Sequence, residues 1–249
     1  MNRPPRRRRW LRWSLAGVGV LLIVLVGAVS AVTVTTTAPT PLTLPSSGGA
    51  SPAAASDPAA LAGIWNAGPR SVVGWRARQV LIGEQSTLFG RTGRVWGSVS
   101  IASGSVTQGG FTVDMRALTS TLSQSSQVSA FDITAFPTAR LQLMSPIAVG
   151  TIPAQGVVDH FPVSASLTLR GITHRVRFTL SAELRRGNLL VLADIPLPFA
   201  DWGISLGGVP FLADIQSPAT IEVLLDLTHI SGNPASVTEA GTSNNGAPR

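Results

Sequence analysis

The side chains best suited to acid–base or metal chemistry are three histidines, His160, His174 and His229. They lie 14 and 55 residues apart, a spacing that fits no local zinc motif, and neither an HExxH pair nor a cysteine accompanies them. We expect His174 in a Gly-Ile-Thr-His turn, His160 in a proline-flanked loop and His229 at a strand end. A metal or acid–base role would require the rings to converge in space. We therefore predict surface positions, no metal site and no cofactor.

The sequence also contains no motif for catalysis by a nucleophile or by paired carboxylates. No G-x-S-x-G elbow presents a serine, and Asp132, Asp201 and Asp214 are scattered along the chain rather than paired. Asp132 and Asp201 fit turn positions, where short carboxylates accept hydrogen bonds from the backbone. The absence of cysteine excludes thiolate nucleophiles, thiolate metal sites, disulfides and a lipidated N-terminal cysteine. The sequence thus predicts no catalytic residues and a protein that is not an enzyme.

The elements that position the remaining side chains have a period of two. Apolar residues alternate with polar ones between residues 61 and 230, and Gly, Pro, Ser and Asn mark the turns. The clearest inward sets are Val73, Trp75, Ala77; Phe111, Val113, Met115; Leu141, Leu143; Leu167, Leu169; Val176, Phe178, Leu180; and Ile221, Val223, Leu225, Leu227. This alternation predicts an antiparallel all-β domain, either a sandwich or a barrel, with residues 118–130 as a short helix or ordered loop.

The positive charge is confined to the N-terminus. The 249 residues carry a net charge of +7, but six of the 19 arginines lie in residues 1–13. The rest of the chain has 13 arginines against 12 acids, a balance of +1. We therefore interpret residues 1–13 as a basic cytoplasmic leader that contacts anionic lipid, and predict no nucleic-acid partner.

An uncharged apolar run follows the leader. Residues 15–34 would span roughly 30 Å as a helix, about the thickness of a bilayer core. Trp10 and Trp13 lie at the junction, and the arginines on the N-terminal flank predict a cytoplasmic N-terminus. We predict a single-pass signal anchor at residues 14–34; the alternative is a cleaved signal peptide that ends near Ala31. In both cases the rest of the chain is extracytoplasmic.

Composition divides the exported part into three segments. Residues 35–60 are rich in Pro, Ser, Thr and Ala, which predicts a disordered linker. Residues 231–249 predict a disordered tail. Residues 61–230 between them are long enough for one well-packed domain.

Several segments of that domain resemble one family in order and spacing. They are SVVGWRAR (71–78), GRTGRVWGSVSI (90–101), FTVDMRALTS (111–120), FDITAFPTARLQL (131–143), ASLTLRGITHRVRFTL (165–180), FADWGI (199–204) and IEVLLDL (221–227). Together they resemble the YceI-like family of exported, lipocalin-like β-barrels over residues 63–228. The most specific pieces are FDITAFPTARLQL and LTLRGITH.

The resemblance implies an eight-stranded antiparallel barrel with an internal apolar channel, which in some members holds a polyisoprenoid or related lipid chain. Here Trp75 stands where many members have Phe, and Arg76-Ala77-Arg78 lacks a histidine found in those members. A tryptophan there would partly fill the lumen. The predicted lumen residues are Val73, Trp75, Phe111, Val113, Met115, Phe131, Phe136, Leu141, Leu143, Leu167, Leu169, Phe178, Leu180, Phe199, Trp202 and Phe211.

Three functional hypotheses follow. The first is a membrane-tethered barrel that binds an isoprenoid or other lipid for sequestration or transport without chemistry. The second is a barrel of the cell envelope that holds no ligand and engages a protein partner, for example through the loop at residues 206–216. The third and weakest is a lipid-acting hydrolase, which would need a histidine, a serine and a carboxylate to meet in a cavity.

Overall fold

A computed structural model of the chain describes residues 38–45, 61–81, 84–149, 157–206, 215 and 217–230. In these segments no helix is both long enough and apolar enough to cross a bilayer. The predicted leader, the predicted membrane span at residues 14–34 and the predicted tail at residues 231–249 all lie outside the described residues.

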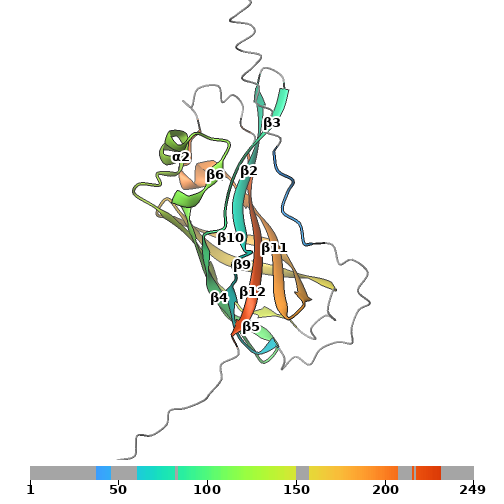
Figure 1. Cartoon of the computed structure of the whole chain (residues 1–249). Coiled ribbons are helices and arrows are strands. Elements are labelled where there is room, and N and C mark those ends of the chain that lie inside the picture. The colour runs from blue at the N-terminus through green and yellow to red at the C-terminus, as the bar shows by residue number, and fades with distance from the viewer. Residues whose placement is uncertain are drawn as a thin grey trace, which may run out of the picture. The chain divides into compact units, whose positions relative to one another are not determined.

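Eight strands close into an antiparallel barrel, as the resemblance implied (Figure 1). In spatial order they are β1 (Gly63–Ala67), β4 (Val95–Ala102), β5 (Ser105–Asp114), β7 (Thr138–Leu143), β9 (Val158–Leu169), β10 (Ile172–Arg185), β11 (Asn188–Leu197) and β12 (Ala219–Ile230). The ring closes because β1 pairs with β4 on one side and with β12 on the other. Closure leaves no free edge in this ring and gives it one inner and one outer face.

A two-stranded ribbon extends one end of the barrel. Strands β1 and β2 (Val72–Leu81) both pair with β12. Strand β1 pairs with the end of β12 near Ile230, and β2 pairs with its start near Thr220. Strand β3 (Glu84–Thr92) pairs with β2 and with the short β6 (Thr119–Ser120), whereas β8 (Ile147–Ala148) pairs with β5. The wall of the barrel is therefore extended beyond β1 on this side by β2 and β3.

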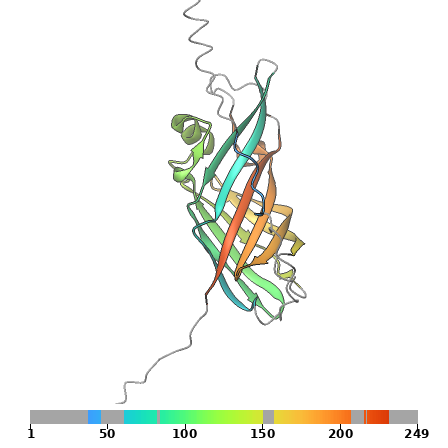
Figure 2. The same cartoon turned by 45° about the vertical axis from the view of Figure 1, so that its right-hand side comes forward.

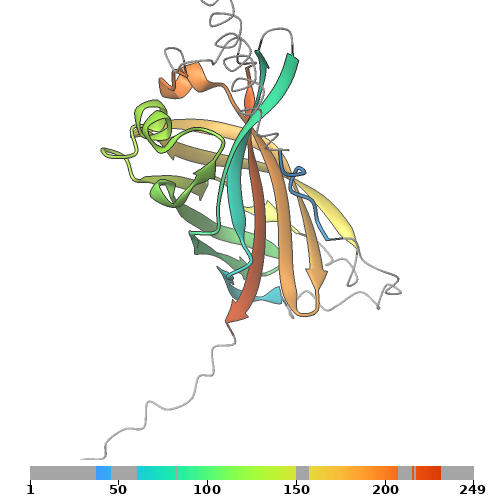
Figure 3. The same ribbon diagram turned by 45° about the horizontal axis from the view of Figure 1, so that its top comes forward.

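Short helices lie at this same end (Figures 1 and 3). They are η2 (Met115–Ala117), α2 (Gln124–Phe131) and η3 (Phe199–Trp202). Helix α2 lies within the segment predicted as a short helix or loop; Ser123 caps it by accepting a hydrogen bond from the Ser126 amide. It ends at Asp132, which adopts the left-handed conformation. Phe131, its last residue, is 1% exposed and anchors the helix in the core.

A segment of the predicted linker lies against the outer wall. Arg91 of β3 donates a 2.6 Å hydrogen bond to the carbonyl of Thr40, and Arg185 of β10 donates one of 2.6 Å to the carbonyl of Pro45. Between them Leu42 and Leu44 are half-buried, whereas the residues next to them are exposed. Figure 2 shows this segment, in blue, along the outside of the barrel. The part of the predicted linker at residues 46–60 lies outside the described residues.

Candidate functional site: the barrel lumen

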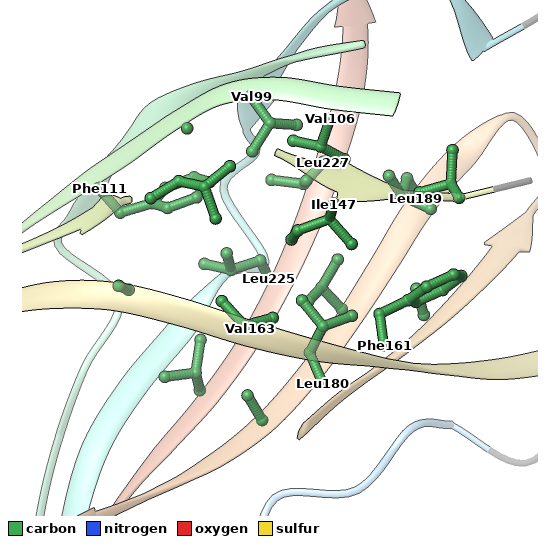
Figure 4. A pocket seen from close by; sticks show the side chains of 18 of the residues that line it. Val99, Val106, Phe111, Ile147, Phe161, Val163, Leu180, Leu189, Leu225 and Leu227 are labelled. Carbon is green, nitrogen blue, oxygen red and sulfur yellow. The ribbon is translucent and has the colours of Figure 1, made fainter. Parts of the chain in front are cut away.

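The inner face of the barrel encloses a cavity of about 130 Å³, which we call the first chamber. Inward positions of seven ring strands line most of it, because alternate residues on each strand face the lumen. Its lining includes Val99, Ile101, Val106, Leu143, Ile147, Phe161, Val163, Phe178, Leu180, Ala182, Leu184, Leu189, Val191, Ala193 and Leu227 (Figure 4). The first chamber is thus built of aliphatic and phenyl groups.

A second chamber, of about 90 Å³, is lined by residues of the helical end. Trp75 of β2, Met115 of η2 and Phe131 of α2 contribute to its wall, together with Leu167 and Leu169 of β9. The Trp75 indole packs against Phe131, with ring centroids 5.5 Å apart, and against Phe199 at 6.3 Å. Trp75 therefore occupies space at this end of the lumen, as its size predicted.

The two chambers adjoin each other at a position that we call the waist. Five residues line both of them: Phe111, Leu141, Ile195, Val223 and Leu225. Phe111 and Leu141 come from β5 and β7, whereas the other three come from β11 and β12 on the opposite side of the ring. The waist is thus lined from opposite walls of the lumen.

The chambers offer hydrocarbon and almost no polar surface. Two charged residues border them. Arg140 is exposed and lies at an outward position of β7, between the inward-facing Ala139 and Leu141. Glu183 of β10 lies between the inward-facing Ala182 and Leu184, but it is 2% exposed and its Oε1 has no hydrogen-bond partner among the described residues. Among the described residues no group of three His, Asp or Glu side chains could hold a metal ion. Such a lumen can remove an apolar molecule from water, but it has no partner for a buried charge.

Most residues predicted for the lumen lie there. Val73, Trp75, Phe111, Val113, Met115, Phe131, Leu141, Leu143, Leu167, Leu169, Phe178 and Leu180 all line one or both chambers. All but Phe131 come from strands or from the turn directly after β5, where the period of two can be followed from the sequence.

Three of the predicted aromatic residues line neither chamber. Phe136 is 38% exposed and covers Gly171 at the tip of the β9–β10 hairpin, so it lies on the surface. Phe199 and Trp202 are buried in η3 but line neither chamber. These residues follow turns or form a 3₁₀ helix, where strand alternation does not determine the side-chain direction. Phe211 lies outside the described residues.

Other lining residues were missed. Leu189, Val191, Ala193 and Ile195 alternate along β11, and this signal was present in the sequence as NLLVLADI. The small lining residues Gly109 and Ala182 carry no comparable signal, because a short side chain is compatible with either face. Strand alternation in the sequence predicts Val223, Leu225 and Leu227 as inward residues, but they are not among the predicted lumen residues.

The histidines do not converge. His174 lies in strand β10 rather than in the turn, because the turn consists of Arg170 and Gly171. His160 lies in strand β9 rather than in a loop. His160 Nδ1 is 2.9 Å from Ser181 Oγ on the exposed outer face, and His174 Nε2 is 2.9 Å from the carbonyl oxygen of Asp201. His229 contacts the Ala62 carbonyl near the end of β12. The structure brings none of these rings into the lumen.

The principal charged cluster lies on the outer wall, at Glu222 of β12. Its carboxylate accepts hydrogen bonds of 2.8 Å from Arg76 and from Arg91, and its side chain is 3% exposed. Burial disfavours the charge, but the hydrogen bonds and positive charges of Arg76 and Arg91 outweigh it and lower the pKa of Glu222. In the facing position of β11, partial desolvation and the charge of Glu222 raise the pKa of Asp194. This network is separated from the lumen by the sheet.

Comparison with known proteins agrees with this architecture. A family model described as "YceI-like domain" matches residues 66–228. A solved structure described as a polyisoprenoid binding domain from Saccharophagus degradans, implicated in plant cell wall breakdown, is similar with a TM-score of 0.54 and 14% identity; the match covers 68% of this chain and 99% of that one. BcnA of Burkholderia cenocepacia is similar with a TM-score of 0.48 and 14% identity, over 63% and 96%. No curated protein matches the chain.

Proposed function

The chain belongs to the YceI-like family, and from this premise we propose that its barrel binds an apolar molecule, an isoprenoid or other lipid chain, in the lumen. One observation carries the proposal: the two chambers are lined by hydrocarbon over nearly all of their surface. The ligand named for the similar Saccharophagus degradans domain, a polyisoprenoid, supports the same chemical class.

Binding in such a lumen is driven by transfer of the ligand out of water. Each buried methylene contributes about 0.8 kcal/mol, so a chain of a few isoprene units gains enough to offset the cost of association. The part of the ligand inside the barrel is uncharged, because both chambers are lined almost entirely by hydrocarbon, and Arg140, the one cation among their described lining residues, is exposed at an outward position. Any charged end stays outside. The barrel holds or carries its ligand without reacting with it.

Lumen occupancy is tested by a variant that fills the first chamber. Ala182 faces this chamber on β10, whereas Thr179 of the same strand is exposed on the outer face. We expect Ala182→Phe to lower the binding of farnesol by the full-length protein at least tenfold, and Thr179→Phe to leave it unchanged. Equal binding by both variants would contradict a site in the lumen. Recovery of a stoichiometric protein partner without lipid would favour the interaction-domain hypothesis instead.

We further propose that residues 14–34 anchor the protein in the cell membrane, with the barrel on the extracytoplasmic side. The apolar run and its arginine-rich flank in the sequence support this arrangement. Alkaline extraction of membranes tests it. An anchored chain remains in the membrane fraction with its N-terminus intact, whereas cleavage near Ala31 would release a shortened chain into the soluble fraction.

A further inference from the structure

One aromatic ring lies at the waist of the lumen. Among the five residues that line both chambers, Phe111 is the only aromatic one; the other four are aliphatic. Figure 4 shows its ring at one end of the first chamber, with Phe161 and Leu189 at the other end. The ring is half-buried and faces the lumen. It therefore lies where a chain would pass from one chamber into the other.

The neighbouring backbone keeps the ring in this position. Phe111 pairs with Gly97 of β4, and a Cβ at Gly97 would lie 2.9 Å from Phe111 Cδ1 and 2.7 Å from its Cα. The ring thus packs directly against a bare Cα, in space that any other residue at position 97 would occupy. Gly109, the preceding inward position of the same strand, has no side chain beside the ring, although Val99 and Leu143 lie close to it.

We infer that Phe111 determines the chain length of the ligand. This inference rests on the proposed function. A chain in one chamber gains affinity with each added isoprene unit until it reaches the ring, and a longer chain must displace the ring toward the opposite wall of Ile195, Val223 and Leu225. The selected ligand is thus an uncharged isoprenoid whose length matches the space on one side of the ring. Replacement by a smaller residue joins the chambers and moves the preference to longer chains.

The test uses the full-length protein in micelles that contain equal amounts of farnesol, geranylgeraniol and solanesol. The prenols bound to the isolated protein are then extracted and quantified by mass spectrometry. We expect Phe111→Ala to raise the ratio of bound solanesol to bound farnesol about tenfold over the unmodified protein, an effect equal to fewer than two buried methylenes. Phe111→Leu, which keeps more of the core volume, gives a smaller shift in the same direction and serves if Phe111→Ala does not fold.

Phe136→Ala is the matched control. Phe136 is 38% exposed and lines neither chamber, so its truncation removes the same side chain and leaves both chambers as they are. We expect it to leave the ratio of solanesol to farnesol unchanged. An unchanged ratio in both Phe111 variants, or an equal shift in Phe136→Ala, would overturn the role of Phe111 while leaving lipid binding intact. Failure of the unmodified protein to bind any of the three prenols would instead reject the proposed function and this inference with it.

Discussion

Arg76 and Glu222 are joined across strands β2 and β12 by a hydrogen bond of 2.8 Å between the guanidinium Nε and the carboxylate Oε1. The second carboxylate oxygen accepts a bond of the same length from Arg91, which also donates to the Thr40 carbonyl. One buried carboxylate thus links β12, β2, β3 and the segment on the outer wall. Because β12 also supplies Val223 and Leu225 to the waist, this network holds the wall against which a ligand would pack.

Removing the charge of Glu222 should destabilise the barrel. We expect Glu222→Gln to lower the free energy of unfolding by about 2 kcal/mol, since two charge-assisted hydrogen bonds lose their ionised acceptor. Asp114→Asn is the control: Asp114 pairs with Arg116, whose side chain is 66% exposed, so solvent screens the pair and the cost is much smaller than that of Glu222→Gln. Urea denaturation measures both, and equal effects of the two substitutions would contradict a special role for Glu222.

The contribution of Glu222 should depend on pH. Its pKa is lowered in the folded protein, so its stabilisation is complete above the pKa of the unfolded chain and is lost as the pH falls through the lower folded pKa. The difference in stability between the unmodified protein and Glu222→Gln should be constant from pH 7 to about pH 5 and shrink below about pH 4. Denaturation midpoints at a series of pH values test this; a difference that grows as the pH falls would show the opposite sign.

Asp194 should behave in the opposite way. Partial desolvation and the nearby Glu222 charge raise its pKa, so its ionised form is less favourable in the folded protein than in the unfolded chain. We expect Asp194→Asn to raise the thermal midpoint at pH 7, and the gain to disappear once the pH falls below the unfolded pKa of the carboxyl. A loss of stability at pH 7 would show instead that the Asp194 charge is satisfied in the folded state.

Gly97 should not tolerate a side chain. A Cβ there would lie 2.1 Å from the carbonyl oxygen of Gly110, and its φ of +143° is one that other residues rarely adopt. We expect Gly97→Ala to cost at least about 2 kcal/mol by chemical denaturation. Gly187→Ala is the control, because Gly187 has a φ of +81° but no atom within 4 Å of a Cβ, so only about 1 kcal/mol of backbone strain is expected. Equal costs would mean that the close approach of β4 and β5 is relaxed in solution.

Strand alternation predicted much of the lumen because each strand obeys a local rule. Residues such as Leu167, Leu169, Phe178 and Leu180 face inward in any closed sheet built from their strands. Closure itself is a long-range property. The pairing of Trp65 in β1 with His229 in β12 joins residues at opposite ends of the domain, and only the family resemblance indicated the barrel in advance.

The waist and the outer charge network could not be predicted from the sequence, because both depend on long-range strand pairing. That Phe111 and Val223 line the same part of the lumen depends on which strands face each other across the ring, not on the neighbours of either residue in sequence. Glu222 alternates with apolar residues and looks like a solvent-exposed position, yet Arg76 and Arg91 cover it from adjacent strands. Phe136 is the converse case: an aromatic residue in the most recognisable motif lies on the surface, because it follows the end of a helix rather than a strand.

The central claim, that the lumen holds an apolar molecule, is tested most directly by the protein purified from membranes of its own source. Its lipids are extracted with organic solvent and identified by mass spectrometry, with Ala182→Phe purified in parallel as the protein with a filled first chamber. We predict one uncharged isoprenoid or other lipid chain, close to one molecule per barrel, strongly reduced in Ala182→Phe. The same lipids in the same amounts from both proteins would contradict the account.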